Sequence, residues 1–115
     1  MIEIKDETEK VILVGVALSD QDDTKESLEE LKDLVSTAGA ETVGMVIQNR
    51  EQQHPGTYVG KGKIEELKSM IWELRATGIV CDDELSPAQM KNLQDELDVK
   101  VMDRTLTVSY THLTL

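Results

Sequence analysis

The sequence predicts an α/β fold, a small doubly wound parallel sheet of about four strands with three crossover helices. Short apolar segments rich in β-branched residues alternate with segments whose apolar residues recur every three or four positions. The tetrapeptide Glu-Glu-Leu-Lys occurs at 29–32 and again at 65–68, each time in a predicted helix that ends in glycine before another strand. Such repeated strand–helix units place parallel strands side by side with helices on both faces.

The first two strands and the helix between them are predicted in the N-terminal half. Residues 11–18 form a continuous apolar run, as in a strand that is buried on both faces. The following helix is predicted to begin at Ser27 or, alternatively, at Asp23, each with a glutamate three residues later, and to end at Gly39. Residues 42–48 are the second strand. The apolar face of the helix consists of Leu28, Leu31, Val35 and Ala38.

The second helix is predicted from about Lys63 to Thr77, with Gly78 closing it. Trp72 falls outside the apolar face of this helix. We expect its side chain at the edge of that face, against a neighbouring element. The face itself is formed by Ile64, Leu67, Ile71 and Leu74.

The third helix has the clearest start in the chain. Ser86 is an N-cap, Pro87 fits the first helical position and Gln89 completes a capping box. The helix lies between a short third strand at 79–81 and a fourth strand at 99–102. Its apolar face consists of Met90, Leu93 and Leu97.

Composition indicates one soluble globular domain. The 115 residues are long enough to bury a core, and 39% of them are hydrophobic and 30% charged. No apolar run has the length of a membrane span, and the charged N-terminus lacks the apolar core of a signal peptide. The single Cys81 cannot form an internal disulfide, which fits a reducing compartment. We therefore expect a cytoplasmic protein with Cys81 buried as a small hydrophobic residue.

An anion-facing corner is predicted where the second helix begins. An extended entry leads into Gly60 and Gly62, which alternate with Lys61 and Lys63. Glycines allow a tight turn and bring backbone N–H groups close to a partner. A helix N-terminus favours anions, and the two lysines add full charges. On these residues alone, a simple helix entry with solvated lysines is the alternative.

The net charge restricts what such a corner can bind. A formal charge of −11 argues against broad nucleic-acid binding by the whole domain, because phosphate contacts require clustered cations. The densest cationic cluster is Lys61, Lys63 and Lys68. We therefore expect an anionic partner to meet this corner.

The residues carry no signature of a catalytic site. The spacing from Gly56 to Gly60 is one residue too short for a P-loop, and the spacing from Gly56 to Gly62 is one too long. Lys61 is also followed by a residue without a hydroxyl group. His54 has no serine, cysteine or carboxylate at a telling distance in the sequence. The chain is therefore not expected to hydrolyse GTP or ATP through a P-loop.

Two acidic groups give an alternative function. Asp20, Asp22 and Asp23 follow the first strand, and Asp82 and Asp83 follow the third, so both groups reach the same edge of a parallel sheet. Clustered carboxylates there hold Mg²⁺ and accept a phosphoryl group in receiver domains. The alternative is a stand-alone doubly wound module that binds a small ligand such as a nucleotide, or a receiver-like phosphoacceptor. Acidic caps on a solvated rim would give the same pattern.

Several segments, in order, resemble the N-terminal domain of the HflX family of ribosome-associated GTPases. The most specific are Thr-Tyr-Val-Gly-Lys-Gly-Lys at 57–63 and Asp-Asp-Glu-Leu-Ser-Pro-Ala-Gln at 82–89. The resemblance covers roughly residues 8 to 106. The other matching segments are Gly15 within 11–18, residues 27–31 and 37–40, Asn92-Leu93, and residues 101–105.

The resemblance implies a fragment of a larger protein. In this family the domain precedes a helical hairpin and a Ras-like G domain, and the whole protein binds the large ribosomal subunit and splits stalled or idle ribosomes. The N-terminal domain contacts ribosomal RNA and restrains the GTPase, and has also been linked to adenine nucleotides. GTP and Mg²⁺ are implied for the missing G domain and no cofactor for this fragment. The contact candidates are Tyr58, Gly60, Lys61, Gly62, Lys63, Asp82, Asp83, Glu84, Ser86, Gln89 and Arg104.

The last residues differ from the family pattern. Residues 107–115 resemble the translated read-through of a transposase-type sequencing adapter. We therefore expect an HflX-type α/β domain at 1–106 and a non-native tail at 107–115, so Tyr110 and His112 carry no functional role. A divergent β-like tail is the alternative.

Overall fold

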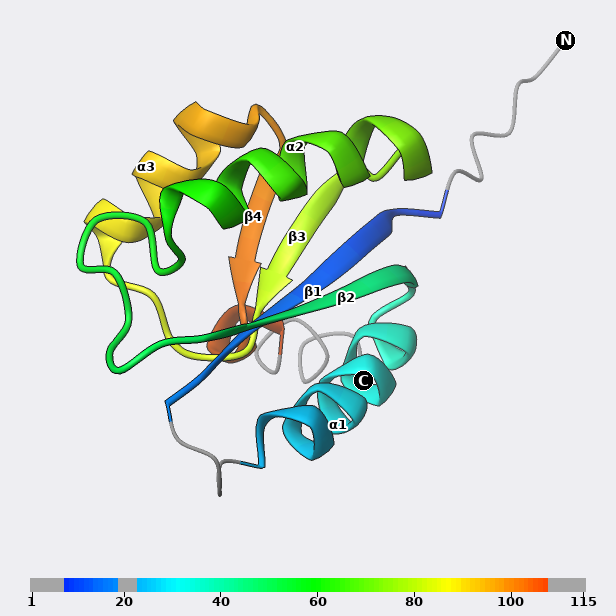
Figure 1. Ribbon diagram of the computed structural model, residues 1–115. Helices are drawn as coiled ribbons and strands as arrows, with labels where there is room; N and C mark the ends of the chain where they lie inside the picture. The colour runs from blue at the N-terminus through cyan, green and yellow to red at the C-terminus, as the bar shows by residue number, and fades with distance from the viewer. Residues whose placement is uncertain (1–7, 19–22, 108–115) are drawn as a thin grey trace, which may run out of the picture.

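The computed structural model describes residues 8–18 and 23–107. Four parallel strands form one sheet in the order β2-β1-β3-β4, and three helices connect them (Figure 1). The predicted α/β fold with a doubly wound parallel sheet is therefore confirmed. In chain order the elements are β1 (Lys10–Ala17), α1 (Thr24–Thr37), β2 (Glu41–Asn49), α2 (Lys61–Leu74), β3 (Gly78–Cys81), α3 (Pro87–Leu97) and β4 (Lys100–Asp103).

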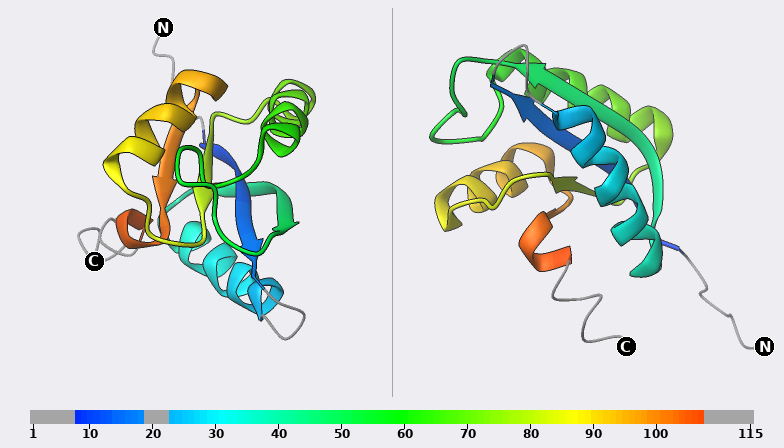
Figure 2. Two further views of the ribbon diagram at one scale, coloured as in Figure 1. Left: turned by 60° about the vertical axis from the view of Figure 1, so that its left-hand side comes forward. Right: turned by 90° about the horizontal axis from the view of Figure 1, so that it is seen from below.

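The two faces of the sheet are covered by different helices. α1 lies on one face, and α2 and α3 lie together on the other, as the two views of Figure 2 show. Val11 and Leu13 of β1 pack with α1, whereas Ile12 and Val14 pack with α2 and α3. β1 is therefore buried on both faces, which explains why its sequence is a continuous apolar run instead of an alternating one.

Strand register brings the carboxyl ends of the strands together. Ala17 pairs with Asn49 of β2, and Val14 pairs with Cys81 of β3. Cys81 in turn pairs with Asp103 of β4. The segments that leave these ends therefore meet at one edge of the sheet, where parallel α/β sheets bind their ligands.

The start of α1 differs from the main prediction. Its N-cap is Asp23, the alternative start, and no side chain caps the helix. The capping box at Ser27 is wrong, because Ser27 lies inside the helix and its hydroxyl donates to Asp82 Oδ1 at 3.0 Å. At the other end Gly39 has φ +98°, the left-handed conformation that ends a helix and suits glycine.

The predicted glycine turn before α2 is wrong. Gly60 is the N-cap with φ −75°, and Gly62 is already helical, so neither takes positive φ. The left-handed residue of this segment is Tyr58, with φ +71°. A Cβ on Gly62 would meet nothing within 4 Å, so no close backbone approach requires glycine there.

The end of α2 also lies elsewhere than predicted. The helix ends at Leu74, and Arg75 takes the left-handed C-cap conformation with φ +57°. Gly78 is instead the first residue of β3. A Cβ on Gly78 would come within 2.8 Å of the carbonyl oxygen of Lys100, so this glycine allows β3 and β4 to approach closely.

The start of α3 confirms the prediction. The hydroxyl of Ser86 accepts a hydrogen bond from the N–H of Gln89 at 3.1 Å, and the Gln89 side chain accepts from the N–H of Ser86 at 3.0 Å. Both bonds of the capping box are therefore made. Leu93 and Leu97 are buried, as the periodicity of the sequence predicts.

Trp72 is not covered by a neighbouring element, so that prediction is wrong. Its side chain is 84% exposed. Lys68, one turn earlier in α2, already lies 3.7 Å from Glu96 near the end of α3. The last turn of α2 therefore extends past α3, and no described element packs against Trp72.

Candidate functional site

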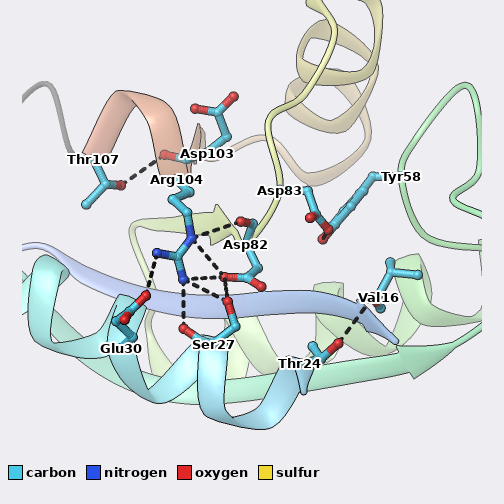
Figure 3. Close-up of polar contacts among 10 residues, drawn as sticks. All are labelled: Val16, Thr24, Ser27, Glu30, Tyr58, Asp82, Asp83, Asp103, Arg104 and Thr107. Atoms are coloured by element: carbon cyan, nitrogen blue, oxygen red, sulfur yellow. Dashed lines mark hydrogen bonds and ion pairs between the residues drawn. The ribbon is translucent and has the colours of Figure 1, made fainter. Parts of the chain in front are cut away.

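The candidate site is the carboxyl edge of the sheet. It is built from the loop between β2 and α2, the loop between β3 and α3, and residues 103–107, which are the last residue of β4 and the helical turn after it (Figure 3). These segments, together with the first turns of α2 and α3 that follow the loops, contain all the predicted contact residues. The structure separates them into exposed groups around the start of α2 and inward-facing groups that hold the loops in place.

The exposed group surrounds the N-terminus of α2. This helix has no side-chain cap, and its first turn contains no acidic residue. The Lys61 side chain is exposed, and Lys63 pairs with Glu66 at 2.9 Å. The N–H of Gly60 donates to Gln48 Oε1 at 2.8 Å, which fixes where the helix begins. The start of this 14-residue helix thus carries one exposed lysine, Lys61, and one half-buried lysine, Lys63.

Arg50 is a further cation at this corner. Its Nη1 lies 2.7 Å from the position that a Cβ on Gly60 would occupy. Its Nε donates to the carbonyl oxygen of Gln52 at 2.9 Å, which holds the side chain on the loop. Arg50 could not be predicted from the sequence, because nine loop residues separate it from Gly60 and no local pattern signals their contact.

Tyr58 faces inward. Its side chain is fully buried, and its hydroxyl donates to Asp83 Oδ2 at 2.6 Å. Burial, and then the hydrogen bond and negative charge of Asp83, raise the pKa of the Tyr58 phenol well above its ordinary value. Of the predicted contact residues, Tyr58 is therefore an anchor between the β2–α2 loop and the end of β3.

Backbone bonds within the β2–α2 loop and side-chain bonds from α3 complete the support of this loop. His54 exchanges two backbone hydrogen bonds with Tyr58, and its Nδ1 accepts from the N–H of Gly56 at 3.0 Å. Gln89 Nε2 donates to the carbonyl oxygen of His54 at 2.9 Å, and Asn92 Nδ2 donates to that of Gly56 at 2.9 Å. His54 and Gln89 thus hold the loop that positions the start of α2.

Arg104 joins three elements at the same edge (Figure 3). Its Nη2 lies 2.8 Å from Asp82 Oδ1 and donates to the carbonyl oxygen of Ser27 at 2.8 Å. Its Nη1 lies 3.1 Å from Glu30 Oε1. Partial burial opposes the charge of Arg104, but the bonds to Asp82 and Glu30 raise its pKa. The predicted contact residues Asp82 and Arg104 are therefore bound to each other and to α1.

Asp103 fixes the end of the domain. Its carboxylate accepts from the N–H of Leu85 at 2.9 Å and from the N–H of Leu106 at 2.9 Å, and the side chain is 3% exposed. The second bond caps the helical turn that begins at Arg104. Thr107 is buried, and its hydroxyl donates to the carbonyl oxygen of Asp103 at 3.0 Å. Residues 108–115 lie outside the described residues, so the non-native tail stays a prediction.

The two aspartates after β3 turn to different partners. Asp82 binds Arg104, and Asp83 binds Tyr58. Asp23 is the N-cap of α1, while Asp20 and Asp22 lie outside the described residues. Within residues 8–18 and 23–107, no group of three or more histidines, cysteines or carboxylates could hold a metal ion. The described part therefore gives no support to a receiver-like magnesium site.

Cys81 is buried, as the sequence predicts. Burial, followed by the negative charges of Asp103, Asp83 and Asp82, raises the pKa of its thiol. A buried thiol with a raised pKa is a poor nucleophile. None of the helices in the described ranges is long and apolar enough to cross a membrane.

The remaining predicted residues are Ser86 and Glu84, at the start of α3. Ser86 is committed to the capping box of α3, whereas Glu84 is exposed beside it. Of the candidates at the start of α2, Lys61 and Gly62 are exposed, Lys63 is half-buried and Gly60 is buried. The candidates that hold the loops are Tyr58, Asp82, Asp83, Ser86, Gln89 and Arg104.

Comparison with known proteins places this geometry in a family. A family model described as "GTP-binding GTPase N-terminal" matches residues 25–108. The chain is 65% identical over 108 residues to GTPase HflX of Lacrimispora saccharolytica, covering 94% of this chain and 26% of that protein. It is 35% identical to GTPase HflX of Escherichia coli (strain K12), covering 91% of this chain and 24% of that protein. The chain thus spans about a quarter of the length of these curated relatives.

A solved structure has the same fold. The structure described as "crystal structure of SsGBP and GDP complex" superposes with a TM-score of 0.68 at 20% identity, covering 91% of this chain and 29% of that one. At this identity the likeness concerns the fold alone. The family model and the sequence relatives together show that the chain belongs to the HflX family of GTPases, of which it is an N-terminal fragment.

Proposed function

We propose that this domain is the ribosome-binding and regulatory N-terminal domain of a GTPase that acts on the large ribosomal subunit. The whole protein splits or rescues ribosomes, and GTP and Mg²⁺ bind to its separate G domain. The fragment itself binds and does not catalyse. Family membership supports the GTPase, since the curated relatives are named GTPase HflX.

The proposed contact with the ribosome rests on one observation of this chain. The uncapped start of α2 collects Lys61, Lys63 and Arg50 at one corner of a protein whose net charge is −11. Ribosomal RNA presents phosphates, which bind to helix N-termini and to clustered cations. The acidic remainder repels RNA. The corner is therefore the part of the described surface that suits a phosphate backbone.

The same site supports binding without chemistry. The thiol of Cys81 and the phenol of Tyr58, near this edge, are poor nucleophiles because both side chains are buried and their pKa values are raised. Asp82 is held by Arg104. The sequence also lacks a P-loop. Regulation of the G domain would therefore act through contact between the domains.

Cosedimentation with purified large ribosomal subunits tests this proposal, with small subunits as the control. We expect the purified chain to pellet with large subunits at low salt and to be released as salt rises. With two or three phosphate contacts, the logarithm of affinity should fall with a slope of roughly 2 to 3 against the logarithm of salt concentration. The purified chain should show no GTP turnover. Failure of both the chain and a full-length family protein to pellet at any salt concentration would refute the proposal.

A further inference from the structure

Trp72 is the most exposed large hydrophobic side chain in the described part of the chain. It is 84% exposed and is the only tryptophan. α2 runs back from the carboxyl edge of the sheet, where Lys61 lies, to the opposite edge, and Trp72 lies near its end (Figure 1). The other exposed apolar residue of α2, Leu74, packs over Gly44 of β2. Trp72 is therefore an isolated aromatic side chain and not the centre of an apolar patch.

Positive charges lie on the same side of α2 as Trp72. At about 100° per residue, Lys61, Lys68 and Trp72 fall within roughly 40° of one another around the helix. Arg75, the C-cap, borders the same open hollow as Trp72. We call Lys61, Lys68, Trp72 and Arg75 the α2 stripe, and all four side chains are exposed. The stripe begins at the cationic corner and extends along α2, which spans about 21 Å.

Two carboxylates share Lys68. Its Nζ lies 3.3 Å from Glu65 Oε2 and 3.7 Å from Glu96 Oε1. The three side chains are between 41% and 63% exposed, so water screens both ion pairs and each contributes little. A phosphate can therefore replace either carboxylate as the partner of Lys68. The carboxylates also limit the attraction at this point, so the indole of Trp72 has to supply most of the affinity of the stripe.

An aromatic side chain between cations suits a nucleotide better than an apolar protein surface. The hollow beside Trp72 is bordered by the charged residues Glu73 and Arg75 and by half-buried Ile71, whereas the centres of protein interfaces are depleted in charge. Proteins that bind single strands combine cations along the backbone with aromatic rings on which bases stack. Bases of a duplex are stacked on each other, so only an unpaired base presents its face to Trp72.

We propose that the α2 stripe binds an unpaired segment of RNA, with one base stacked on Trp72 and the adjacent phosphates at Lys68 and Arg75. The same strand reaches the corner at Lys61. The inference rests on the proposed function and specifies the kind of RNA that the domain meets, namely a loop, a bulge or a strand end.

Fluorescence of Trp72 tests the stacking contact directly, because no other tryptophan contributes. An adenosine oligomer of about eight nucleotides is longer than α2, since a stacked strand rises about 3.4 Å per nucleotide. We expect this oligomer to quench the emission by at least about half, and the same strand in a duplex or an abasic strand to change it by less than about a tenth. No quenching by the single strand would overturn the inference. Equal quenching by the abasic strand would also overturn it, because charge alone would then be responsible.

Cosedimentation with large ribosomal subunits tests whether the contact is used on the ribosome. Trp72→Leu should lose at least about fivefold in affinity, the lower end of what one stacked base contributes, and Trp72→Phe should lose less. Lys68→Ala should make the salt slope shallower by roughly 0.7, the value for one phosphate of a single strand. Lys91→Ala removes an exposed charge of α3 outside the stripe and should bind within about twofold of the unmodified chain. Melting curves establish that each variant is folded.

The outcomes separate this inference from the proposed function. If the unmodified chain pellets and Trp72→Leu pellets equally well, RNA binds at the corner alone and the inference is overturned while the proposed function stands. If Trp72→Leu loses binding but no oligomer quenches Trp72, a protein of the subunit covers the indole, which also overturns the inference. If no protein pellets, the proposed function fails and the inference fails with it.

Discussion

Tyr58 shows how a single residue can replace an expected glycine. Its left-handed backbone costs roughly 1–2 kcal/mol for a residue with a side chain. Full burial of the ring and a 2.6 Å hydrogen bond to Asp83 offset this cost. The sequence does not reveal that Tyr58 has positive φ, because its partner Asp83 lies 25 residues away and glycine is the usual residue at positive φ.

Gly62 is a glycine at a position where the backbone does not require one, so its replacement should stabilise the domain. Because it is exposed, helical and free of close neighbours, Gly62→Ala should stabilise the domain by about 0.5–1 kcal/mol. Urea unfolding followed by circular dichroism measures the change. Gly39→Ala is the matched comparison and should destabilise, since Gly39 has φ +98°. A destabilising Gly62→Ala would mean that the glycine is needed for more than entry into the helix.

Tyr58 also predicts sensitivity to alkali. Its pKa is raised in the folded state, so above the ordinary value of 10.0 the unfolded chain loses the proton first. The stability that it contributes is complete below pH 10 and falls as pH rises, by up to about 1.4 kcal/mol per pH unit for one proton.

Tyr58→Phe should remove this part of the alkaline loss. The variant should be less stable at pH 8, because Asp83 loses its donor, yet its unfolding free energy should fall less steeply above pH 10. Urea unfolding of both proteins between pH 8 and 11.5 gives the two slopes. Parallel slopes would contradict the assignment of the titration to Tyr58.

At the scale of elements, the sequence predicts features that neighbouring residues determine, such as a helix cap. It does not predict features that depend on contacts between distant segments. The capping box of α3 was predictable because Ser86 and Gln89 are three residues apart. The end of α2 was not, because Arg75 takes the left-handed cap position and Gly78 serves the approach of β3 to β4. Trp72 was misplaced for a similar reason, since its exposure depends on where α3 ends.

The candidate site likewise has one part that the sequence predicts and one part that it does not. The outward-facing corner at Lys61 and Lys63 follows from a short motif and a helix start, both visible in the sequence. The inward-facing network does not, because Arg104 lies 77 residues from Ser27 and 74 from Glu30. A sequence pattern identifies such an arginine as unusual but gives no indication of its partners.

Arg104 is therefore expected to matter for stability. Arg104→Ala should cost roughly 2–4 kcal/mol, because it leaves the nearly buried Asp82 carboxylate without its partner. Arg104→Lys should restore only part, since an ammonium cannot reproduce the fork of the guanidinium. Lys91→Ala, which removes an exposed pair with Asp95, is the control and should change stability by less than about 0.5 kcal/mol. Chemical denaturation distinguishes these results, and equal small effects for Arg104→Ala and Lys91→Ala would contradict the account.

At the scale of the whole molecule, the charge distribution and the sheet topology both favour one orientation of the domain toward RNA. The parallel sheet brings the β2–α2 loop and the start of α2 to the carboxyl edge, where Arg50, Lys61 and Lys63 gather. The net charge of −11 disfavours approach of RNA to the remaining surface. The domain should thus meet RNA with this corner.

Large-subunit cosedimentation of two matched charge variants tests this central claim most directly. Lys61→Ala with Lys63→Ala removes two positive charges at the corner, and Lys25→Ala with Lys32→Ala removes two exposed charges from α1 on the opposite face. We expect the corner variant to lose at least tenfold in affinity at low salt and to show a salt slope shallower by roughly 1.5. The α1 variant should bind within about twofold of the unmodified chain, because charges beyond a Debye length of about 10 Å are largely screened. Equal binding by both variants and the unmodified chain at every salt concentration would contradict the claim that this corner contacts ribosomal RNA.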